Sequence, residues 1–187
     1  MSETSKRARG STSVQLVLCT IFLVPLALGI YLSTGTNRRS IHANQVSHDL
    51  ASMYAQGVDF SQQANRNIAR RMLDARDGKT LLIFTRIRSV SAADCSPLPG
   101  APCANNGYPV IVQRIVIGDV DLHGSSLGSP VNIDAATGNV LNWTTDTSAR
   151  VSDSSVSPLK PGESAYAAET FIAGPDDHTG VYARTLF

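Results

Sequence analysis

The sequence has few charged residues, few aromatic residues and almost no net charge. Charged side chains make up 17% of the 187 residues, aromatic side chains make up 6%, and the formal net charge is +1. The charged fraction is low, since soluble domains average about a quarter. General nucleic-acid binding requires a basic stripe or patch, which a chain of this charge balance does not provide. We therefore expect no nucleic-acid partner.

The sequence also offers little for catalysis or metal binding. It contains no HExxH, no GxGxxG and no GxxxxGK[ST], the short motifs of zinc proteases and nucleotide-binding proteins. Strand alternation would place Asp119, Asp121 and His123 on one face. A solvated strand end explains these residues better than a cation site does. We expect no catalytic residue, no metal and no cofactor.

A long apolar run lies near the N-terminus. The 19 residues from Val14 to Leu32 carry no formal charge, and a helix of that length, at about 1.5 Å per residue, just spans a hydrocarbon core of about 30 Å. Basic residues are denser before the run than after it, which by the positive-inside rule places residues 1–10 in the cytoplasm. A cleaved signal peptide ending near residues 33–35 is the alternative, although the run is longer than a usual signal core.

Helical periodicity follows the apolar run. Apolar residues recur at three- and four-residue steps from Val46 to Met72, and the pattern falters at Gly57. This predicts one helix that continues to about Gln56 and a second helix over residues 62–73.

Beyond Gly78 the composition turns to β-branched residues. We predict one antiparallel hairpin of Thr80–Ser91 with Tyr108–Gly118, another of Ala165–Ile172 with Thr179–Phe187, and a short strand over Asn139–Thr144. The predicted fold class is α+β, with a long N-terminal transmembrane and amphipathic helix, a second short helix and a C-terminal antiparallel sheet. The predicted parts are a basic cytoplasmic leader, a transmembrane helix, amphipathic helices and a β-rich exported head, over residues 1–10, 11–35, 36–78 and 79–187.

Two residue pairs are candidates for contacts in the head. Cys95 and Cys103 bracket a loop with three prolines and a glycine, which in an oxidising compartment predicts a disulfide. Zinc is a poor alternative, because the spacing is not CxxC and there is no second cysteine pair. Arg114 and Glu169 lie in apolar strands and form the candidate cross-sheet pair, the alternative being that both face water.

The start of the apolar helix carries a further pattern. Residues 9–15 read RGSTSVQ, and the apolar run that follows contains Pro25 within a Val-Pro-Leu element. A basic segment that ends in glycine and leads directly into an apolar helix resembles the class III signal of type IV pilin-like proteins. The pattern from residue 9 to Met53 resembles the TadE-like minor pseudopilins of tight-adherence pilus systems.

The resemblance implies a processing site. A prepilin peptidase would cut after Gly10, on the cytoplasmic side, so that the mature chain begins at Ser11. The sequence departs from the family at the fifth mature position, where Gln15 replaces a glutamate. In the family that glutamate meets the N-terminal amine of a neighbouring subunit within the bilayer, and Gln15 cannot neutralise that charge.

Three residues further along the helix fit close packing in lipid. Pro25 removes a backbone hydrogen bond and kinks the helix. Gly29 and Ser33 form a small-xxx-small pair, which lets neighbouring helices approach closely.

The resemblance implies a non-enzymatic minor pilin or pseudopilin that acts in the assembly or structure of a tight-adherence-type pilus. Its partners would be other pilins and pseudopilins, the assembly machinery, the prepilin peptidase and membrane lipid. It would be a single-pass protein of the bacterial inner membrane, with a cytoplasmic N-terminus and its bulk in the periplasm or in an extracellular pilus. The alternative is a secreted or membrane-anchored binding module that uses its β-rich head.

Overall fold

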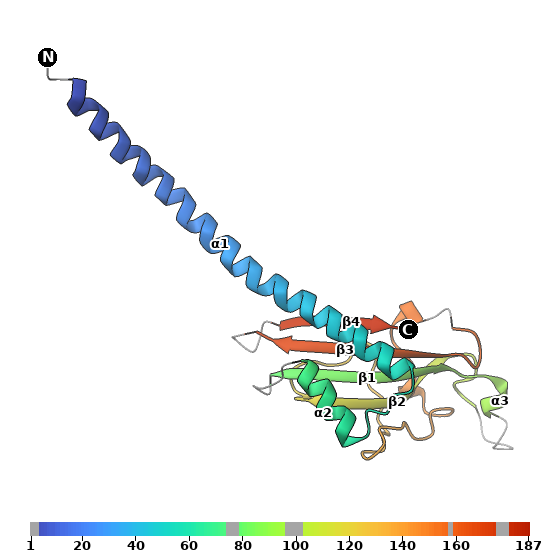
Figure 1. Cartoon of the computed structure of the whole chain (residues 1–187). Helices are drawn as coiled ribbons and strands as arrows, with labels where there is room; N and C mark the ends of the chain where they lie inside the picture. The colour runs from blue at the N-terminus through green and yellow to red at the C-terminus, as the bar shows by residue number, and fades with distance from the viewer. Residues whose placement is uncertain (1–3, 74–78, 96–102, 157–158, 175–179) are drawn as a thin grey trace. The chain divides into compact units, whose positions relative to one another are not determined.

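The computed structural model describes residues 4–73, 79–95, 103–156, 159–174 and 180–187, with all side chains in these ranges other than those of residues 4–15, 32–36 and 155. This part of the chain is α+β, as predicted, and it divides into two compact units, Met1–Arg39 and Ser40–Phe187. Figure 1 labels its helices α1 (Thr4–Ala55), α2 (Gln63–Met72) and α3 (Ala92–Cys95), and its strands β1 (Thr80–Ser89), β2 (Pro109–Gly118), β3 (Ser164–Ala173) and β4 (Gly180–Leu186).

In the first unit α1 is an uninterrupted helix that continues through Pro25. The Thr20 hydroxyl donates back to the Leu16 carbonyl at 2.7 Å, one turn earlier, which keeps this polar side chain satisfied within its own helix. Within the described part of the chain, no helix has the combination of length and hydropathy that a membrane crossing requires.

In the second unit α1 ends in a glycine turn, close to its predicted end. Gly57 has a φ of +93°, in the left-handed region where glycine is least strained. Its N–H donates to the Tyr54 carbonyl and the Val58 N–H donates to the Met53 carbonyl, both at 3.0 Å. These two bonds are those of a Schellman motif, so the turn itself explains why the helix stops at Ala55.

The strands form one antiparallel sheet in the order β2-β1-β3-β4 (Figure 1). Both predicted hairpins are confirmed, because β1 pairs with β2 and β3 pairs with β4. β1 also pairs with β3, which makes β1 and β3 the inner strands. The register of β1 against β2 shifts between Arg86 and Ile87, and such a bulge bends a strand locally.

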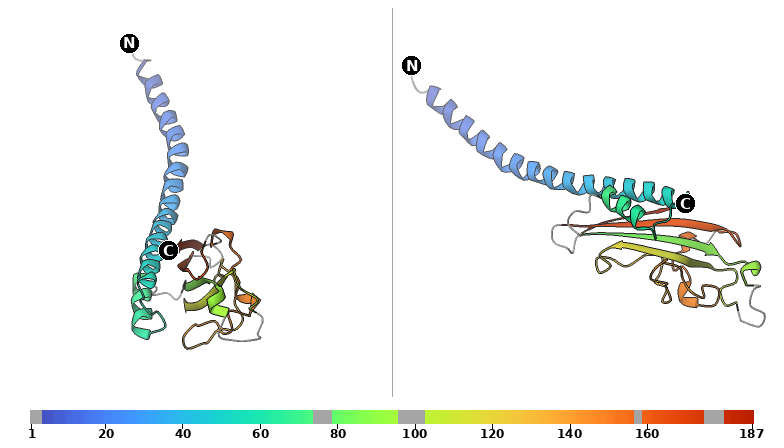
Figure 2. Two further views of the ribbon diagram at one scale, coloured as in Figure 1. Left: turned by 90° about the vertical axis from the view of Figure 1, so that its right-hand side faces the viewer. Right: turned by 60° about the horizontal axis from the view of Figure 1, so that its bottom comes forward.

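One face of the sheet packs against the end of α1 and against α2, as both views of Figure 2 show. Phe60, between the two helices, stacks on Phe84 of β1 with ring centroids 4.1 Å apart. Tyr54 meets both rings edge-on. The buried residues of this layer are Val46, Leu50, Ala51, Tyr54, Phe60, Ala69, Leu73, Leu82, Phe84, Ile115, Ile117 and Ala168.

The opposite face is covered by the long connection between β2 and β3 (Figure 2). Four buried residues of this connection complete the second core, which also contains β-strand residues: Leu127, Val140, Ala149 and Val156. The predicted strand over Asn139–Thr144 is wrong, because its first two residues make only isolated bridges. Left-handed backbone at Gly138 (φ +71°) and at Asn142 (φ +54°) bounds the extended stretch on both sides and keeps it short.

Candidate functional site

The described side chains of the first unit form an apolar surface on α1, which we call the apolar helix surface (residues 16–31). Its large apolar side chains have exposed fractions from 51% for Val24 to 77% for Tyr31. They are Leu16, Val17, Leu18, Ile21, Phe22, Leu23, Val24, Leu26, Leu28, Ile30 and Tyr31. Successive helical residues lie about 100° apart, so this run places apolar groups on every side. A helix that is apolar all round is normally enclosed by lipid or protein.

The structure locates part of the predicted helix-packing set on this surface. Pro25 and Gly29 both lie within it, and a Cβ added at Gly29 would meet no atom within 4 Å. Ser33 belongs to α1, but its side chain lies outside the described residues. The predicted processing residues Gly10, Ser11 and Gln15 are also helical, in a part of α1 whose side chains lie outside the described residues.

In the second unit the carboxylate of Glu169 is buried beneath the connection between β2 and β3, with an exposed fraction of 1%. Its Oε1 accepts hydrogen bonds from the Ser126 N–H at 2.8 Å, the Ser126 hydroxyl at 2.9 Å and the Tyr182 hydroxyl at 2.5 Å. Its Oε2 accepts from the Ser125 hydroxyl at 2.6 Å. A buried carboxylate requires such donors, because desolvating it alone is costly. These bonds tie the connection to β3 and β4.

Arg114 and Glu169, the candidate cross-sheet pair, are joined through a hydroxyl group. They belong to β2 and β3, which β1 separates, and both are buried. Arg114 Nη2 donates to the Ser125 hydroxyl at 3.0 Å, and Ser125 donates to Glu169. Arg114 Nη1 donates to the Gly128 carbonyl. Burial lowers the pKa of the Arg114 guanidinium, and the charge of Glu169 acts against that change.

Two residues of β4 complete this network. Arg184 pairs with Asp153 and donates to the Ser126 hydroxyl at 3.0 Å. Burial raises the pKa of Tyr182 to about 12, and the bond to Glu169 adds to the rise. The Tyr182 hydroxyl is therefore a hydrogen-bond donor at neutral pH.

The segment 124–128 (GSSLG) matches the GxSxG spacing of a nucleophile elbow, a motif that the sequence reasoning missed. An elbow requires a strand before the serine and a helix after it, and residues 119–128 form neither. The hydroxyl of Ser126 is instead engaged with Glu169, Tyr182 and Arg184. Among the hydrogen bonds of the described residues, none joins Ser126 to a histidine. Ser126 therefore belongs to the hydrogen-bond network that holds the Glu169 carboxylate.

The residues considered for cation binding do not form a site. β2 ends at Gly118, so strand alternation does not extend to Asp119 and Asp121. Asp119 instead accepts from the Asp121 N–H at 3.0 Å in a turn. The His123 ring stacks on Phe171 and on Tyr182 at 5.2 and 4.8 Å. In the described ranges, no cluster of three His, Cys, Asp or Glu residues could hold a metal ion.

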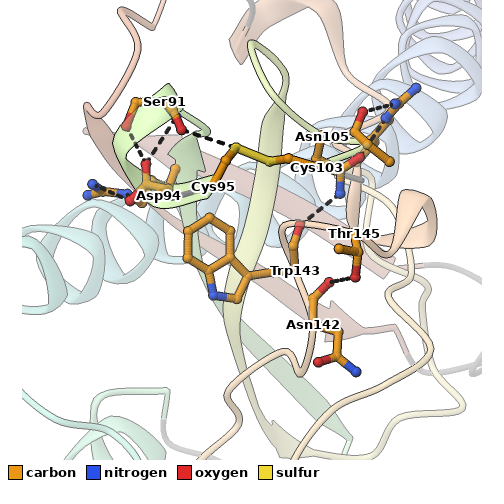
Figure 3. The surroundings of a disulfide bond; sticks show 11 residues. Ser91, Asp94, Cys95, Cys103, Asn105, Asn142, Trp143 and Thr145 are labelled. Atoms are coloured by element: carbon orange, nitrogen blue, oxygen red, sulfur yellow. Dashed lines mark hydrogen bonds and ion pairs between the residues drawn. A yellow bond between two sulfur atoms is a disulfide. The ribbon is translucent and has the colours of Figure 1, made fainter. Parts of the chain in front are cut away.

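Cys95 and Cys103 are joined by a disulfide, as predicted, with their Cα atoms 5.6 Å apart (Figure 3). The neighbouring Asp94 carboxylate accepts from the Ser91 N–H at 3.0 Å and the Ser91 hydroxyl at 2.7 Å. It also forms an ion pair with Arg88, whose Nε and Nη2 both donate to its Oδ1, at 3.1 and 2.9 Å. The short helix α3 is thus fixed to β1 beside the disulfide.

On the other side of the disulfide, Asn105 holds the turn that carries Trp143 (Figure 3). Its side-chain amide donates to the carbonyls of Trp143 and Asp146 at 2.8 and 2.7 Å. Its oxygen accepts from Arg150 Nε at 2.8 Å, and the Arg150 guanidinium lies 3.9 Å above the ring of Tyr108. Residue 105 is fully buried, so these bonds fix the position of Trp143.

Comparison of this chain with protein-family models, with curated proteins and with solved structures finds no match. Its function is therefore inferred from its own residues and their geometry.

Proposed function

We propose that this chain is a non-enzymatic subunit of a tight-adherence-type pilus, similar to the TadE-like minor pseudopilins. In this proposal its N-terminal helix crosses the bacterial inner membrane and packs against the helices of neighbouring pilins, while its α+β head lies outside the cytoplasm. The apolar helix surface carries the proposal. The pattern of residues 9–53, which resembles that family, supports it.

The apolar side chains of the apolar helix surface must be shielded from water by other molecules. Eleven large apolar side chains between Leu16 and Tyr31 are each more than half exposed. Burying one such side chain fully contributes about 1.5–3 kcal/mol, so a chain that kept all of them in water would associate or insert. Lipid and neighbouring helices meet this requirement, since the uncharged run from Val14 to Leu32 has 19 residues and a membrane helix needs about 20.

Small residues on the helix favour contacts with other helices. The open space around Gly29 would let a neighbouring backbone approach closely, which is how small residues act in membrane helix pairs. Pro25 cannot donate to the Ile21 carbonyl one turn earlier, and membrane helices tolerate such breaks because neighbours can satisfy the freed group. Both features suit a subunit that packs among similar helices.

Gln15 favours a minor role over a major one. At the fifth position of a chain that begins at Ser11, an amide can hydrogen-bond to a neighbour's N-terminal amine but cannot neutralise it. A charge left unpaired in the bilayer is costly. A subunit with Gln15 therefore makes a weaker contact with the subunit ahead of it or occupies an end position with none.

The disulfide supports an exported head. Disulfides form and persist in oxidising compartments such as the periplasm and the cell surface, and the Cys95–Cys103 bond lies in the head. This agrees with the charge bias of the sequence, which places residues 1–10 in the cytoplasm.

The mature N-terminus tests the proposal. The full chain is expressed in a bacterium that has a tight-adherence system, and the N-terminal peptide from the membrane fraction is identified by mass spectrometry. We expect a chain that begins at Ser11. A start near Thr36 would support a secreted binding module instead, and an intact Met1 would leave a plain membrane anchor.

Two glycine substitutions give a matched comparison. Gly10→Leu should leave the full-length precursor in the membrane, because prepilin peptidases require glycine before the cut. Gly29→Leu, in the same helix and with free space around it, should be processed at Ser11 as before. Identical N-termini in the Gly10→Leu variant and the unchanged chain would contradict the proposal.

A further inference from the structure

Two adjoining hollows lie around Arg86 of β1, and one of them is also lined by Tyr54 at the end of α1. Their volumes are about 320 and 630 Å³, and both are lined by Arg86, Asn139 and Tyr166. We call them together the Arg86 groove, whose walls include Tyr54, Gln113 and Trp143. Ligand sites have volumes of about 300–1,000 Å³, so the Arg86 groove has room for a small ligand.

The sheet register builds the floor of the groove. Arg86 of β1 lies opposite Gln113 of β2 on one side and opposite Tyr166 of β3 on the other. Tyr54, at the end of α1, meets the ring of Tyr166 edge-on at 5.3 Å and donates its hydroxyl to Gln113 Oε1 at 2.9 Å. The Gln113 amide in turn donates to the Thr137 carbonyl at 2.9 Å. These contacts hold the floor in place without any ligand.

Arg86 and Arg88 lie two residues apart on the same face of β1 and differ in one respect. Arg88 has a carboxylate partner, Asp94, whose Oδ1 accepts hydrogen bonds from both Nε and Nη2 of the guanidinium. Arg86 is partly buried, yet it makes no hydrogen bond or ion pair with any residue that the structure describes. Asp59 also lines the groove, but its oxygens accept from the Ser61 N–H and the Gln62 amide. The charged residues that line the groove are Arg86, Arg88, Asp59 and Asp94, and of the two arginines only Arg86 has no bonded partner in the described structure.

Other groups in the groove are also free to bind. In the described structure, the Asn139 side-chain amide and the indole N–H of Trp143 make no hydrogen bond. Asn139 is exposed on one wall, and Trp143 is partly buried on another, beside Cys95 (Figure 3). The Trp143 side chain lines one of the two hollows, and the face of an indole ring has negative charge density that attracts weakly positive C–H groups. The groove thus combines aromatic surface, planar polar groups, the ion pair of Arg88 with Asp94, the Asp59 carboxylate and one arginine, Arg86, without a bonded partner among the described residues.

This combination fits a sugar better than a peptide. Peptides that bind to sheets usually add a strand to a free edge, whereas β1 is an inner strand. The nearby edge of β2 is already used, because the Val140 N–H donates to the Val112 carbonyl at 2.9 Å. A sugar ring needs no such edge, since its C–H face packs on an aromatic ring and its hydroxyls bond to amides.

We propose that the Arg86 groove binds an acidic saccharide, whose carboxylate pairs with Arg86 as Asp94 pairs with Arg88. A guanidinium and a carboxylate match as two parallel hydrogen bonds, which gives both strength and orientation. Trp143 supplies the aromatic face for the sugar ring, and Asn139 bonds to its hydroxyls. The proposal is independent of the filament role, because it depends only on the head.

Tryptophan fluorescence measures this binding directly, because the chain contains one tryptophan and it lies in the groove. The full chain in detergent micelles is titrated with trigalacturonate and with 3′-sialyllactose. Each acidic probe has a neutral match, the methyl ester of trigalacturonate and lactose. We expect saturable quenching with at least one acidic probe, and an affinity about tenfold or more weaker for its neutral match.

Substitutions locate the site. Arg86→Gln should weaken binding of the acidic probe about tenfold or more and leave its neutral match unchanged. Arg70→Gln, which removes an exposed arginine of α2 outside the groove, should bind as the unchanged chain does. Asn139→Ala, at an exposed position, should weaken the binding of both the acidic probe and its neutral match. This variant still tests the site if Arg86→Gln fails to fold.

Several outcomes would overturn the proposal. They are no response to either acidic probe, equal affinity for the acidic and neutral members of a pair, and full affinity in a folded Arg86→Gln variant. Saturable binding of the peptide Glu-Glu-Glu without binding of either sugar would show that the groove is a peptide site. The N-terminus of the mature chain reports separately on the filament role.

Discussion

Phe22 and Phe60 have the same side chain, but one is exposed and the other is buried. Phe22, in the first unit, is 74% exposed, whereas Phe60, in the second unit, is 0% exposed and stacks on Phe84. The same contrast holds for whole regions. The first unit exposes apolar side chains all around a helix, and the second unit buries an apolar layer on each face of its sheet.

Polar side chains in the second unit complete the contrast. Glu169 and Arg114 are buried, with exposed fractions of 1% and 7%. Arg114 donates to the Ser125 hydroxyl, which in turn donates to Glu169. The second unit therefore gives these two buried charged groups polar partners. The large apolar side chains of residues 16–31 are exposed instead, and in the proposed filament lipid and neighbouring helices would cover them.

The largest expected effect separates the two phenylalanines. Phe60→Ala should lower the free energy of unfolding of the head by about 3–5 kcal/mol, because it leaves a cavity beside Phe84. Phe22→Ala should leave that free energy unchanged, since Phe22 belongs to the first unit and is 74% exposed. Urea denaturation of the full chain in detergent micelles, followed by Trp143 fluorescence, measures both. Equal losses in the two variants would remove the contrast between the regions.

A smaller loss is expected from Glu169→Ala, about 3 kcal/mol. The change leaves the Ser125 and Tyr182 hydroxyls without their acceptor and Arg114 without its compensating charge. Asp121→Ala, which alters an exposed carboxylate, should change stability by no more than about 0.5 kcal/mol. The same urea titration measures both, and a neutral Glu169→Ala result would mean that the network does not stabilise the head.

The cysteines allow the same comparison between regions. Replacing Cys95 and Cys103 together by serine should lower the free energy of unfolding by about 2–3 kcal/mol, because the unfolded chain regains the freedom of a short loop. Cys19, a free and exposed thiol in the first unit, serves as the control, and Cys19→Ser should change nothing. Mass mapping under non-reducing conditions should find the disulfide in exported protein, and two free thiols there would contradict the structure.

The smallest expected effect is on how steeply the free energy of unfolding falls with rising pH in the alkaline range. The pKa of Tyr182 is about 12 in the folded head and about 10 in an unfolded chain. The stability from its neutral hydroxyl is then fully present below pH 10 and is lost as the pH rises toward 12. Tyr182→Phe should make the free energy of unfolding fall less steeply between pH 10 and 12. Tyr54, whose pKa burial also raises, contributes to the fall that remains.

Tyr31→Phe, a change on the apolar helix surface, provides the matched control for that slope. Its urea midpoints between pH 9 and pH 12 should follow those of the unchanged chain. A Tyr182→Phe profile that also follows the unchanged chain would show that the hydroxyl does not couple to folding.

Local signals in the sequence were enough to predict the main elements. The apolar run, the periodicity up to Gly57 and the β-branched runs each determine their own backbone conformation, so the C-terminal end of α1, both ends of α2 and both hairpins were predicted within a few residues, whereas α1 begins at Thr4, inside the predicted leader. The disulfide was predictable for the same reason, because Cys95 and Cys103 are 8 residues apart. The prediction of a short strand over residues 139–144 was wrong, because the composition of this segment gives no sign of the left-handed backbone at Asn142.

Only the tertiary structure decided which polar side chains meet. Ser125 and Glu169 are 44 residues apart, and the Ser47 hydroxyl reaches the Ala168 carbonyl across 121 residues. Such pairs depend on the register of four strands and on how the long connection folds over the sheet. Arg88 obtains its carboxylate from a local contact, because Asp94 lies six residues further along the chain in α3, whereas Arg86 has no bonded partner in the described structure. Short-range patterns in the sequence by themselves determined the main helices and strands, whereas the hydrogen-bond partners of the buried Glu169 carboxylate were fixed by long-range packing, which no short-range pattern encodes.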